Sequence, residues 1–130
     1  MDLHVMINLH RGKSHRFLDD ADAMVQQQRW DLATNRYYHA CFHIVHAPFL
    51  KDGLTVKTHD GTLTTLGKTY ILTGRIEKKH GHFFARMIQL RIKADYNSVA
   101  EVSESEVRKM ASSSHEFVDR IESILDPQTL

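Results

Sequence analysis

The sequence predicts an all-α protein, folded as an up-and-down antiparallel bundle of four to five helices. The 130-residue chain contains only two prolines and six glycines, and most segments between them are too long for β-strands. Apolar residues recur in these segments at spacings of three and four, which places them on one face of a helix. Such a face has to be buried against other helices, so a bundle is expected.

Two long helices are expected in the N-terminal part of the chain. The first runs from about Leu3 to Gln28, with Gly12 as a candidate point of interruption. Asp31 is expected to cap the second helix, because its carboxylate can accept a hydrogen bond from a free first-turn amide. Pro48 removes one helical amide and predicts a kink or an early end nearby. Asp52-Gly53 then provides a stop signal.

Three further helices are expected in the rest of the chain. A short one, about Gly61 to Leu72, lies between loops, and a longer one covers His82 to Tyr96. The last, Ser103 to Leu125, has the clearest pattern, because Ser103 and Glu106 have the spacing of a capping box. Its apolar seam consists of Val107, Met110, Ala111, Ser114, Phe117, Val118, Ile121, Ile124 and Leu125.

Composition excludes several classes of protein. The 17 Lys and Arg residues nearly balance 16 Asp and Glu, which argues against a general polyanion binder. The single cysteine, Cys41, cannot form an internal disulfide and suits a reducing compartment. The apolar runs fall far short of the roughly 20 residues that a membrane helix needs, and the first residues do not resemble a secretory signal. A cytoplasmic protein without membrane contact is therefore expected.

Arg91 is the most informative charged residue. It lies four residues after Met87 and three after Ile88, so it projects from the apolar face of its predicted helix. Because a guanidinium keeps its charge and is costly to bury unpaired, something must satisfy it. One candidate is Asp95 at the i+4 position. The others are a partner across an interface and a phosphate in a cleft, with Tyr96 beside the phosphate as a donor or a stacking surface.

Aromatic residues surround the second predicted helix. Arg36-Tyr37-Tyr38 is followed by Phe42, and Tyr37 and Phe42 cannot share one helical face. Most of this cluster is expected to serve core and dimer packing, while Arg36 and Tyr37 are also candidates for ligand or partner contacts.

Three histidines follow in the same helix. The spacing of His39, His43 and His46 puts them on one face, an acceptable geometry for zinc. No Asp, Glu or Cys completes a site on that face, so a partly exposed stripe is favoured and no metal is expected. The sequence also has no Walker or Rossmann glycine loop, and no cofactor is expected.

The polar stretch Lys57-Thr58-His59-Asp60-Gly61 precedes the short predicted helix. Lys57 and His59 beside free helical amides suit an anion, so both are candidates for phosphate binding. Capping by Thr58 or Asp60 explains most of the same pattern without a ligand.

Taken together, the chain resembles the HEPN family of prokaryotic helical proteins from about Ala21 to Leu125, and residues 1–130 are interpreted as one such domain. The resemblance rests on four blocks in order: Arg36-Tyr37-Tyr38-His39-Ala40-Cys41-Phe42-His43, Lys57-Thr58-His59-Asp60-Gly61, Thr73-Gly74-Arg75, and Arg91 with Ala94-Asp95-Tyr96. It implies an up-and-down bundle that usually dimerises. It also implies frequent pairing with a small nucleotidyltransferase-like protein, often as a toxin–antitoxin pair.

Many HEPN proteins are metal-independent ribonucleases with an arginine, usually a polar residue after it, and a histidine about five positions on. Arg91 matches the arginine, whereas Ile92 and Tyr96 occupy the other two positions. Tyrosine, with a pKa of about 10, is a poor general base at neutral pH. If the chain is catalytic, Arg91 and Tyr96 are the candidate residues.

The leading hypothesis is a dimer that binds a nucleotide, RNA or a nucleotidyltransferase-like partner. Arg36, Tyr37, Lys57, His59 and Asp95 are its candidate contact residues. One rival is an active endoribonuclease toxin in which His59 or His43 replaces the missing base, and another is a structural adaptor.

Overall fold

The structure is a computed structural model, which describes residues 2–96 and 102–125. Its elements in chain order are α1 (Leu3–Gln26), α2 (Trp30–Lys51), α3 (His59–Thr65), the π-helix η1 (Leu66–Ile71), α4 (Lys78–Tyr96) and α5 (Glu104–Leu125). The described residues contain no strand, and the predicted all-α fold is confirmed.

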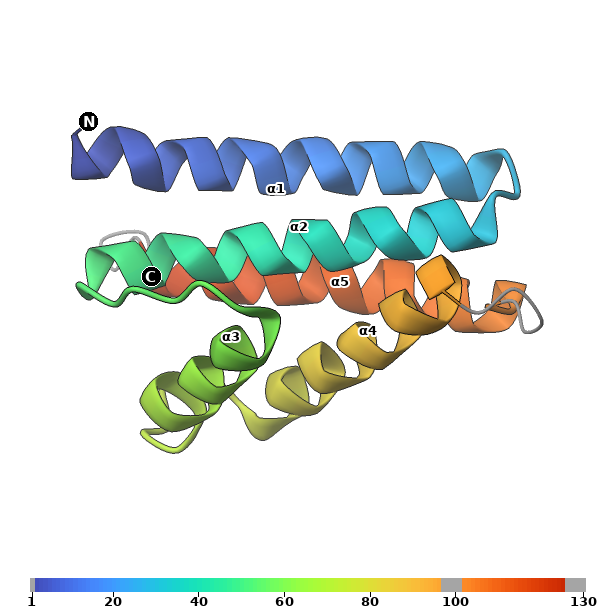
Figure 1. Cartoon of the computed structure of the whole chain (residues 1–130). Coiled ribbons are helices and arrows are strands. Elements are labelled where there is room, and N and C mark those ends of the chain that lie inside the picture. The colour runs from blue at the N-terminus through green and yellow to red at the C-terminus, as the bar shows by residue number, and fades with distance from the viewer. Residues whose placement is uncertain (1, 97–101, 126–130) are drawn as a thin grey trace.

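The helix α2 lies at the centre of the bundle. It contacts α1, α4 and α5, and Figure 1 shows α1, α2 and α5 as three long helices lying side by side. Successive long helices run in opposite directions, with α4 inclined to the other three. The expected antiparallel, up-and-down arrangement is therefore present. The central position of α2 explains why apolar and aromatic residues lie on several of its sides, since three other helices pack against it.

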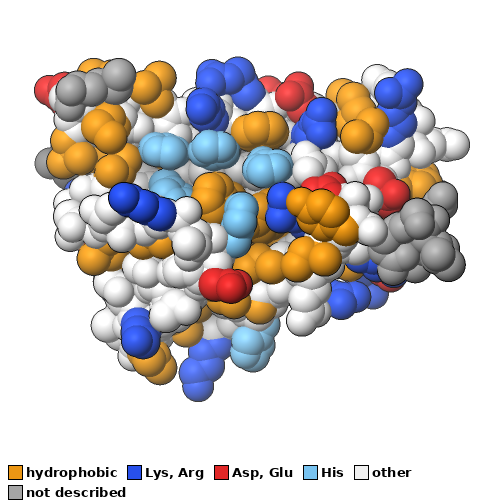
Figure 2. Space-filling model, in the orientation of Figure 1, with side chains coloured by type: hydrophobic (Ala, Val, Ile, Leu, Met, Phe, Trp, Pro, Cys, Tyr) orange, Lys and Arg blue, Asp and Glu red, His pale blue; other side chains and the backbone are white. Residues whose placement is uncertain are grey.

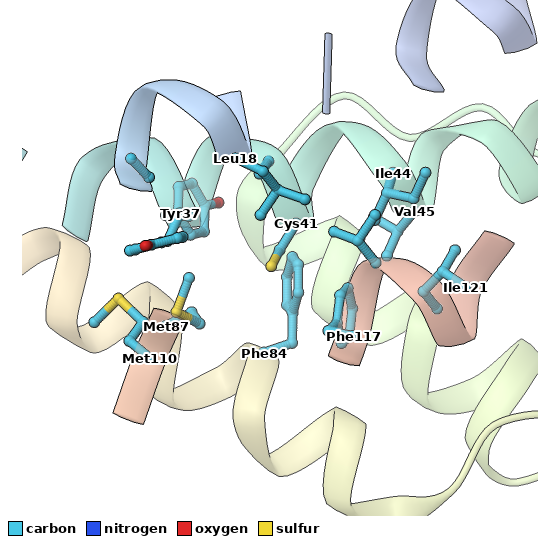
Figure 3. Close-up of a cluster of buried hydrophobic side chains, with 14 of the residues drawn as sticks. Leu18, Tyr37, Cys41, Ile44, Val45, Phe84, Met87, Met110, Phe117 and Ile121 are labelled. Carbon is cyan, nitrogen blue, oxygen red and sulfur yellow. The ribbon is translucent and has the colours of Figure 1, made fainter. Parts of the chain in front are cut away.

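The core lies where α2 meets α1, α4 and α5 (Figure 3). Figure 3 shows side chains of α2 pointing toward Phe84 and Met87 of α4 and toward Phe117 and Ile121 of α5. Cys41 of α2 is fully buried among them, and burial raises the pKa of its thiol to about 12. The thiol therefore packs as a small apolar group rather than reacting as a thiolate.

Three local expectations for the first two helices need correction or refinement. Helix α1 passes through Gly12 without interruption, because its packing against α2 outweighs the low helix propensity of one glycine. Asp31 does not cap α2; Arg29 occupies that position, and Oδ1 of Asp31 accepts a hydrogen bond from the amide of Val102 at 3.3 Å. Helix α2 also continues past Pro48 and ends at Lys51, directly before the predicted stop, where Gly53 has a φ of 74°.

The short third helix is confirmed, but its second half is wound more loosely than expected. Thr58 caps α3, and its hydroxyl accepts a hydrogen bond from the amide of Gly61 at 2.9 Å. The chain then continues as the π-helix η1, in which the amide of Leu72 donates to the carbonyl of Gly67. In α5 the hydroxyl of Ser103 accepts from the amide of Glu106 at 3.2 Å, as the capping pattern predicts.

Candidate functional site

Arg91 lies between the aromatic rings of two helices. Its guanidinium carbon is 5.5 Å from the ring centroid of Tyr38 in α2 and 5.7 Å from that of Tyr96, one turn further along α4. Both distances are within the range of cation–π attraction. The Tyr38 ring is fully buried, whereas Tyr96 is 72% exposed. Arg91 therefore packs against a core ring on one side and lies beside a solvent-exposed ring on the other.

The local pairing of Arg91 with Asp95 is present. Nε of Arg91 lies 3.1 Å from Oδ2 of Asp95, and the side chains are only 20% and 23% exposed. The Nε atom nevertheless forms no hydrogen bond within the part of the chain that the structure describes. The pair is therefore close in distance but poorly aligned, and we treat it as an electrostatic contact that leaves this donor unused.

A second contact connects Asp95 to α2. The side-chain amide of Asn35 donates to both carboxylate oxygens of Asp95, at 3.3 and 3.1 Å. Asn35 in turn accepts a hydrogen bond from Nη1 of Arg36 at 3.0 Å. Three of the predicted site residues, Arg36, Asp95 and Arg91, are thus joined by Asn35, a residue that the sequence did not single out.

His59 reaches the same place from α3. Its Nδ1 forms a short hydrogen bond with the hydroxyl of Tyr38, and its ring lies 4.8 Å from that of Phe42. His39 is on the other side, with its ring 5.4 Å from that of Tyr38. We call this group the Arg91 site; it consists of Tyr38, His39, His59, Arg91, Asp95 and Tyr96.

The electrostatics of the Arg91 site keep its imidazoles neutral. Partial burial lowers the pKa of both His39 and His59, and the positive charge of Arg91 lowers each of them further. Burial also raises the pKa of Tyr38 to about 12, so its hydroxyl stays protonated. Near pH 7 the site therefore combines the fixed cation of Arg91 and the carboxylate of Asp95 with neutral groups that can donate or accept hydrogen bonds.

A row of histidines extends from the Arg91 site across α2 to α1. The predicted stripe of His39, His43 and His46 is joined by His10 of α1, whose Nδ1 lies 3.1 Å from Nδ1 of His43. One of these two rings must donate and the other accept. Phe17 of α1 stacks on both His39 and His43, at 5.4 and 5.6 Å. Figure 2 shows histidine side chains gathered on this face of the molecule.

The side chains of the histidine row are not arranged like the ligands of a metal ion. Over residues 2–96 and 102–125 there is no group of three or more His, Cys, Asp or Glu side chains placed to hold an ion. The rings instead pack on one another and on aromatic neighbours, as in the 4.5 Å contact between Phe42 and His46.

Two of the predicted contact residues lie elsewhere. Tyr37 is fully buried, and its hydroxyl donates to Oδ1 of Asp22 in α1 at 2.5 Å, so the expectation that it contacts a ligand is wrong. Because adjacent helical residues point about 100° apart, Tyr38 faces α4 while Tyr37 faces α1. Lys57 is exposed in the segment before α3, two residues from His59.

Comparison of the chain with known proteins identifies its family. The HEPN domain profile matches residues 7–124, which is nearly the whole chain. This chain belongs to the HEPN family. A UPF0332 protein of Thermotoga maritima is 31% identical over 121 residues, which cover 93% of this chain and 92% of the relative.

Two further relatives come from Methanocaldococcus jannaschii. The protein named "Putative toxin MJ0605" is 31% identical over 108 residues, covering 83% of this chain and 80% of the relative. The protein named "Putative toxin MJ0142" is 23% identical over 113 residues, covering 87% and 77% respectively. The word toxin in these two names refers to those relatives and not to this chain.

The imidazoles of the Arg91 site come from helices other than the one that carries Arg91. Ile92 and Tyr96, which the resemblance places at the expected polar and histidine positions, are both exposed on α4. The imidazoles near Arg91 come instead from α2 and α3.

None of the described helices has a span long and apolar enough to cross a membrane.

Proposed function

We propose that this HEPN protein is a member of a toxin–antitoxin type pair and that its Arg91 site binds the phosphate backbone of RNA. The observation that carries the proposal is the position of Arg91, held by a buried tyrosine on one side and open to an exposed tyrosine on the other. The two Methanocaldococcus relatives named as toxins support the biological setting.

The groups of the Arg91 site suit a nucleotide. A guanidinium presents a planar set of donors that matches two phosphate oxygens. The Tyr96 ring is exposed beside it and offers a surface on which a base can stack. His39 and His59 are neutral and can hydrogen-bond to sugar or base atoms without adding charge.

We further propose that the protein works as a homodimer in the cytoplasm and pairs with a nucleotidyltransferase-like protein. A dimer would bring together two copies of the Arg91 site and lengthen the surface available to RNA. Light scattering at micromolar concentration, alone and after co-expression with a neighbouring nucleotidyltransferase gene, tests both associations.

RNA binding can be tested by fluorescence anisotropy with a labelled single-stranded RNA. We expect Arg91→Ala to lose binding, and Arg91→Lys to bind weakly because lysine keeps the charge without the planar fork. The matched control is Arg86→Ala, which removes an exposed arginine from the same helix. Equal RNA affinity of wild type and Arg91→Ala would refute the proposed site.

A second candidate function is RNA cleavage with His59 as general base. It is favoured by the contact between His59 and Tyr38, which places an imidazole with a lowered pKa beside the ring that Arg91 faces. A neutral imidazole can accept the proton of a ribose hydroxyl, while the guanidinium stabilises the phosphate charge. His43 lies within the histidine row and contacts His10 and Phe17 instead, so His59 is the stronger candidate.

The test is cleavage of labelled RNA in the presence of EDTA. If His59 is the base, His59→Ala should abolish cleavage and His43→Ala should not. Because the pKa of His59 is lowered, the rate should fall only below the usual imidazole pKa of about 6.5 and should stay level between pH 7 and 8. RNA binding without cleavage at any pH would leave binding alone as the function.

A further inference from the structure

A pocket next to the Arg91 site is formed by α1 and α2. It is lined by Lys13, Arg16, Phe17, Asp20 and His43 and has a volume of about 260 Å³. Phe17 and His43 form its aromatic part, and their ring planes are nearly parallel, with 6° between them. Lys13 and Arg16 are exposed at its edge. We call this the Phe17 pocket.

The Phe17 pocket is continuous with the Arg91 site through aromatic contacts. The ring of Phe17 stacks on His39 at 5.4 Å, and His39 contacts Tyr38, over which Arg91 lies. A chain of side-chain contacts therefore runs from Arg91 of α4 through the buried Tyr38 and His39 of α2 to Phe17 of α1. Figure 2 shows histidine, apolar and basic side chains adjoining one another along this face.

We propose that the Phe17 pocket is a second subsite for single-stranded RNA, in which Phe17 and His43 stack a base while Lys13 and Arg16 bind an adjoining phosphate. The inference rests on the proposed function, because the same strand would pass from Arg91 to the pocket. Proteins that bind single strands combine stacking platforms with a positive path for the backbone, and this face has both.

The charge of Asp20 favours one position of the RNA phosphate within the pocket. Asp20 is the one acidic side chain among the pocket's lining residues, and it lies one helical turn after Arg16. A phosphate would be repelled from Asp20 and drawn toward Lys13 and Arg16. Asp20→Asn should therefore strengthen RNA binding, which a pocket built for a basic protein segment would not show.

The test measures the affinity of the full-length protein for a labelled decamer of adenylate at several salt concentrations. For single strands, the slope of log K against log salt changes by about 0.7 for each phosphate contact. Lys13→Ala/Arg16→Ala should flatten the slope by about 0.7, because the two side chains bind one phosphate, and Arg91→Ala should flatten it by about 0.7 as well. The control Lys68→Ala/Lys78→Ala removes two exposed lysines outside the pocket and should leave the slope unchanged.

Phe17 is tested with three variants, because it is half-buried and its loss can disturb packing. Phe17→Leu keeps apolar volume but loses the ring, so affinity should fall roughly 10-fold without a change in slope. Phe17→Tyr keeps the ring and should bind as wild type does. Phe17→Ala should bind no better than Phe17→Leu, and thermal melting of all three checks that they are folded.

The outcomes separate this inference from the proposed function. If only Arg91→Ala weakens binding, the Phe17 pocket is not an RNA subsite and the Arg91 site stands. If wild type does not bind the decamer, both fail. If the Lys13 and Arg16 changes leave RNA binding intact but prevent capture of a co-expressed partner protein, the pocket is a protein interface and the inference is wrong.

Discussion

The buried ring of Tyr38 contacts Arg91 on one side and His59 on another, so one side chain of α2 positions groups from α4 and α3. The guanidinium carbon of Arg91 lies 5.5 Å from the centroid of this ring. The hydroxyl at the end of the same ring bonds to the imidazole of His59. Substitutions at Tyr38 can therefore remove its hydrogen bond to His59 while keeping its ring contact with Arg91, or remove both.

We predict that Tyr38→Phe and Tyr38→Leu differ in effect. Tyr38→Phe removes only the hydroxyl bonded to His59 and should lower the free energy of unfolding by about 1 kcal/mol, with RNA affinity nearly unchanged. Tyr38→Leu also removes the ring beneath Arg91, so RNA affinity should fall as well. Urea denaturation and RNA anisotropy measure the two effects. Equal RNA affinity of Tyr38→Leu and wild type would show that Arg91 does not depend on this ring.

The stability of the protein should fall in mild acid because of His43. Burial, chiefly, and the neighbouring His10 lower the pKa of His43 to about 4, below its usual value of about 6.5. Between these values the unfolded chain binds a proton that the folded protein does not, so stability is full above about pH 6.5 and is lost toward pH 4. Allowing for solvent screening at this half-buried site, we expect a loss of about 1–2 kcal/mol from His43.

Urea denaturation at pH 7.5 and pH 5 tests this prediction. His43→Gln should reduce the loss of stability between the two pH values, because glutamine does not titrate. His82→Gln, which changes an exposed histidine of α4, is the matched control and should retain the wild-type loss. The same pH dependence in His43→Gln as in wild type would contradict the assignment to His43.

Removing the cap of α3 should destabilise the segment that carries His59. Thr58→Ala removes the hydroxyl that accepts from the amide of Gly61 and should cost about 1 kcal/mol. Thr58→Ser keeps the hydroxyl and should be close to wild type. Thr64→Ala, at an exposed position within α3, is the control. Thermal melting measures all three, and a stable Thr58→Ala variant would show that the cap is dispensable.

Asp22 should be needed to satisfy the buried hydroxyl of Tyr37. Its carboxylate accepts from Tyr37 of α2 at 2.5 Å and lies 2.9 Å from Nε2 of His115 in α5, so it joins three helices. Asp22→Ala leaves the hydroxyl of Tyr37 without its acceptor and should cost about 1–3 kcal/mol. The double variant Asp22→Ala/Tyr37→Phe should recover part of that loss, because the unsatisfied group is gone.

Urea denaturation of the single and double variants gives the coupling energy between Asp22 and Tyr37. Asp19→Ala, at an exposed position of α1, controls for the loss of one acidic residue from the helix. Strict additivity of the two changes would mean that the hydrogen bond contributes little to stability.

Local patterns predicted most of the secondary structure. The capped seam of α5 could be located from Ser103 onward, and the end of α2 from Asp52-Gly53, since caps and stops depend on neighbouring residues. The details that were missed depend on other helices. Asp31 bonds to the amide of Val102 across the fold, and Gly12 stays helical because α2 supports α1.

The candidate site was only partly visible in the sequence. Arg91 could be recognised because a guanidinium on an apolar face is costly to leave unsatisfied, and its i+4 spacing from Asp95 identified the local pair. An aromatic spacing of four between Tyr38 and Phe42 was the available signal for the face that meets His59. The same cluster also contained Tyr37, and nothing local showed which of the two buried tyrosines would face α4 and which would face α1.

By itself, then, the sequence determined the helices, the apolar faces that make them pack, and the cation that must find a partner. Helix geometry and burial act over a few residues, so these features are local. Only the tertiary structure decided that Phe17 and His10 of α1 join the histidines of α2, and that Tyr38 lies between Arg91 and His59. Those contacts join residues far apart in the chain, and they depend on which face each helix presents to its neighbours.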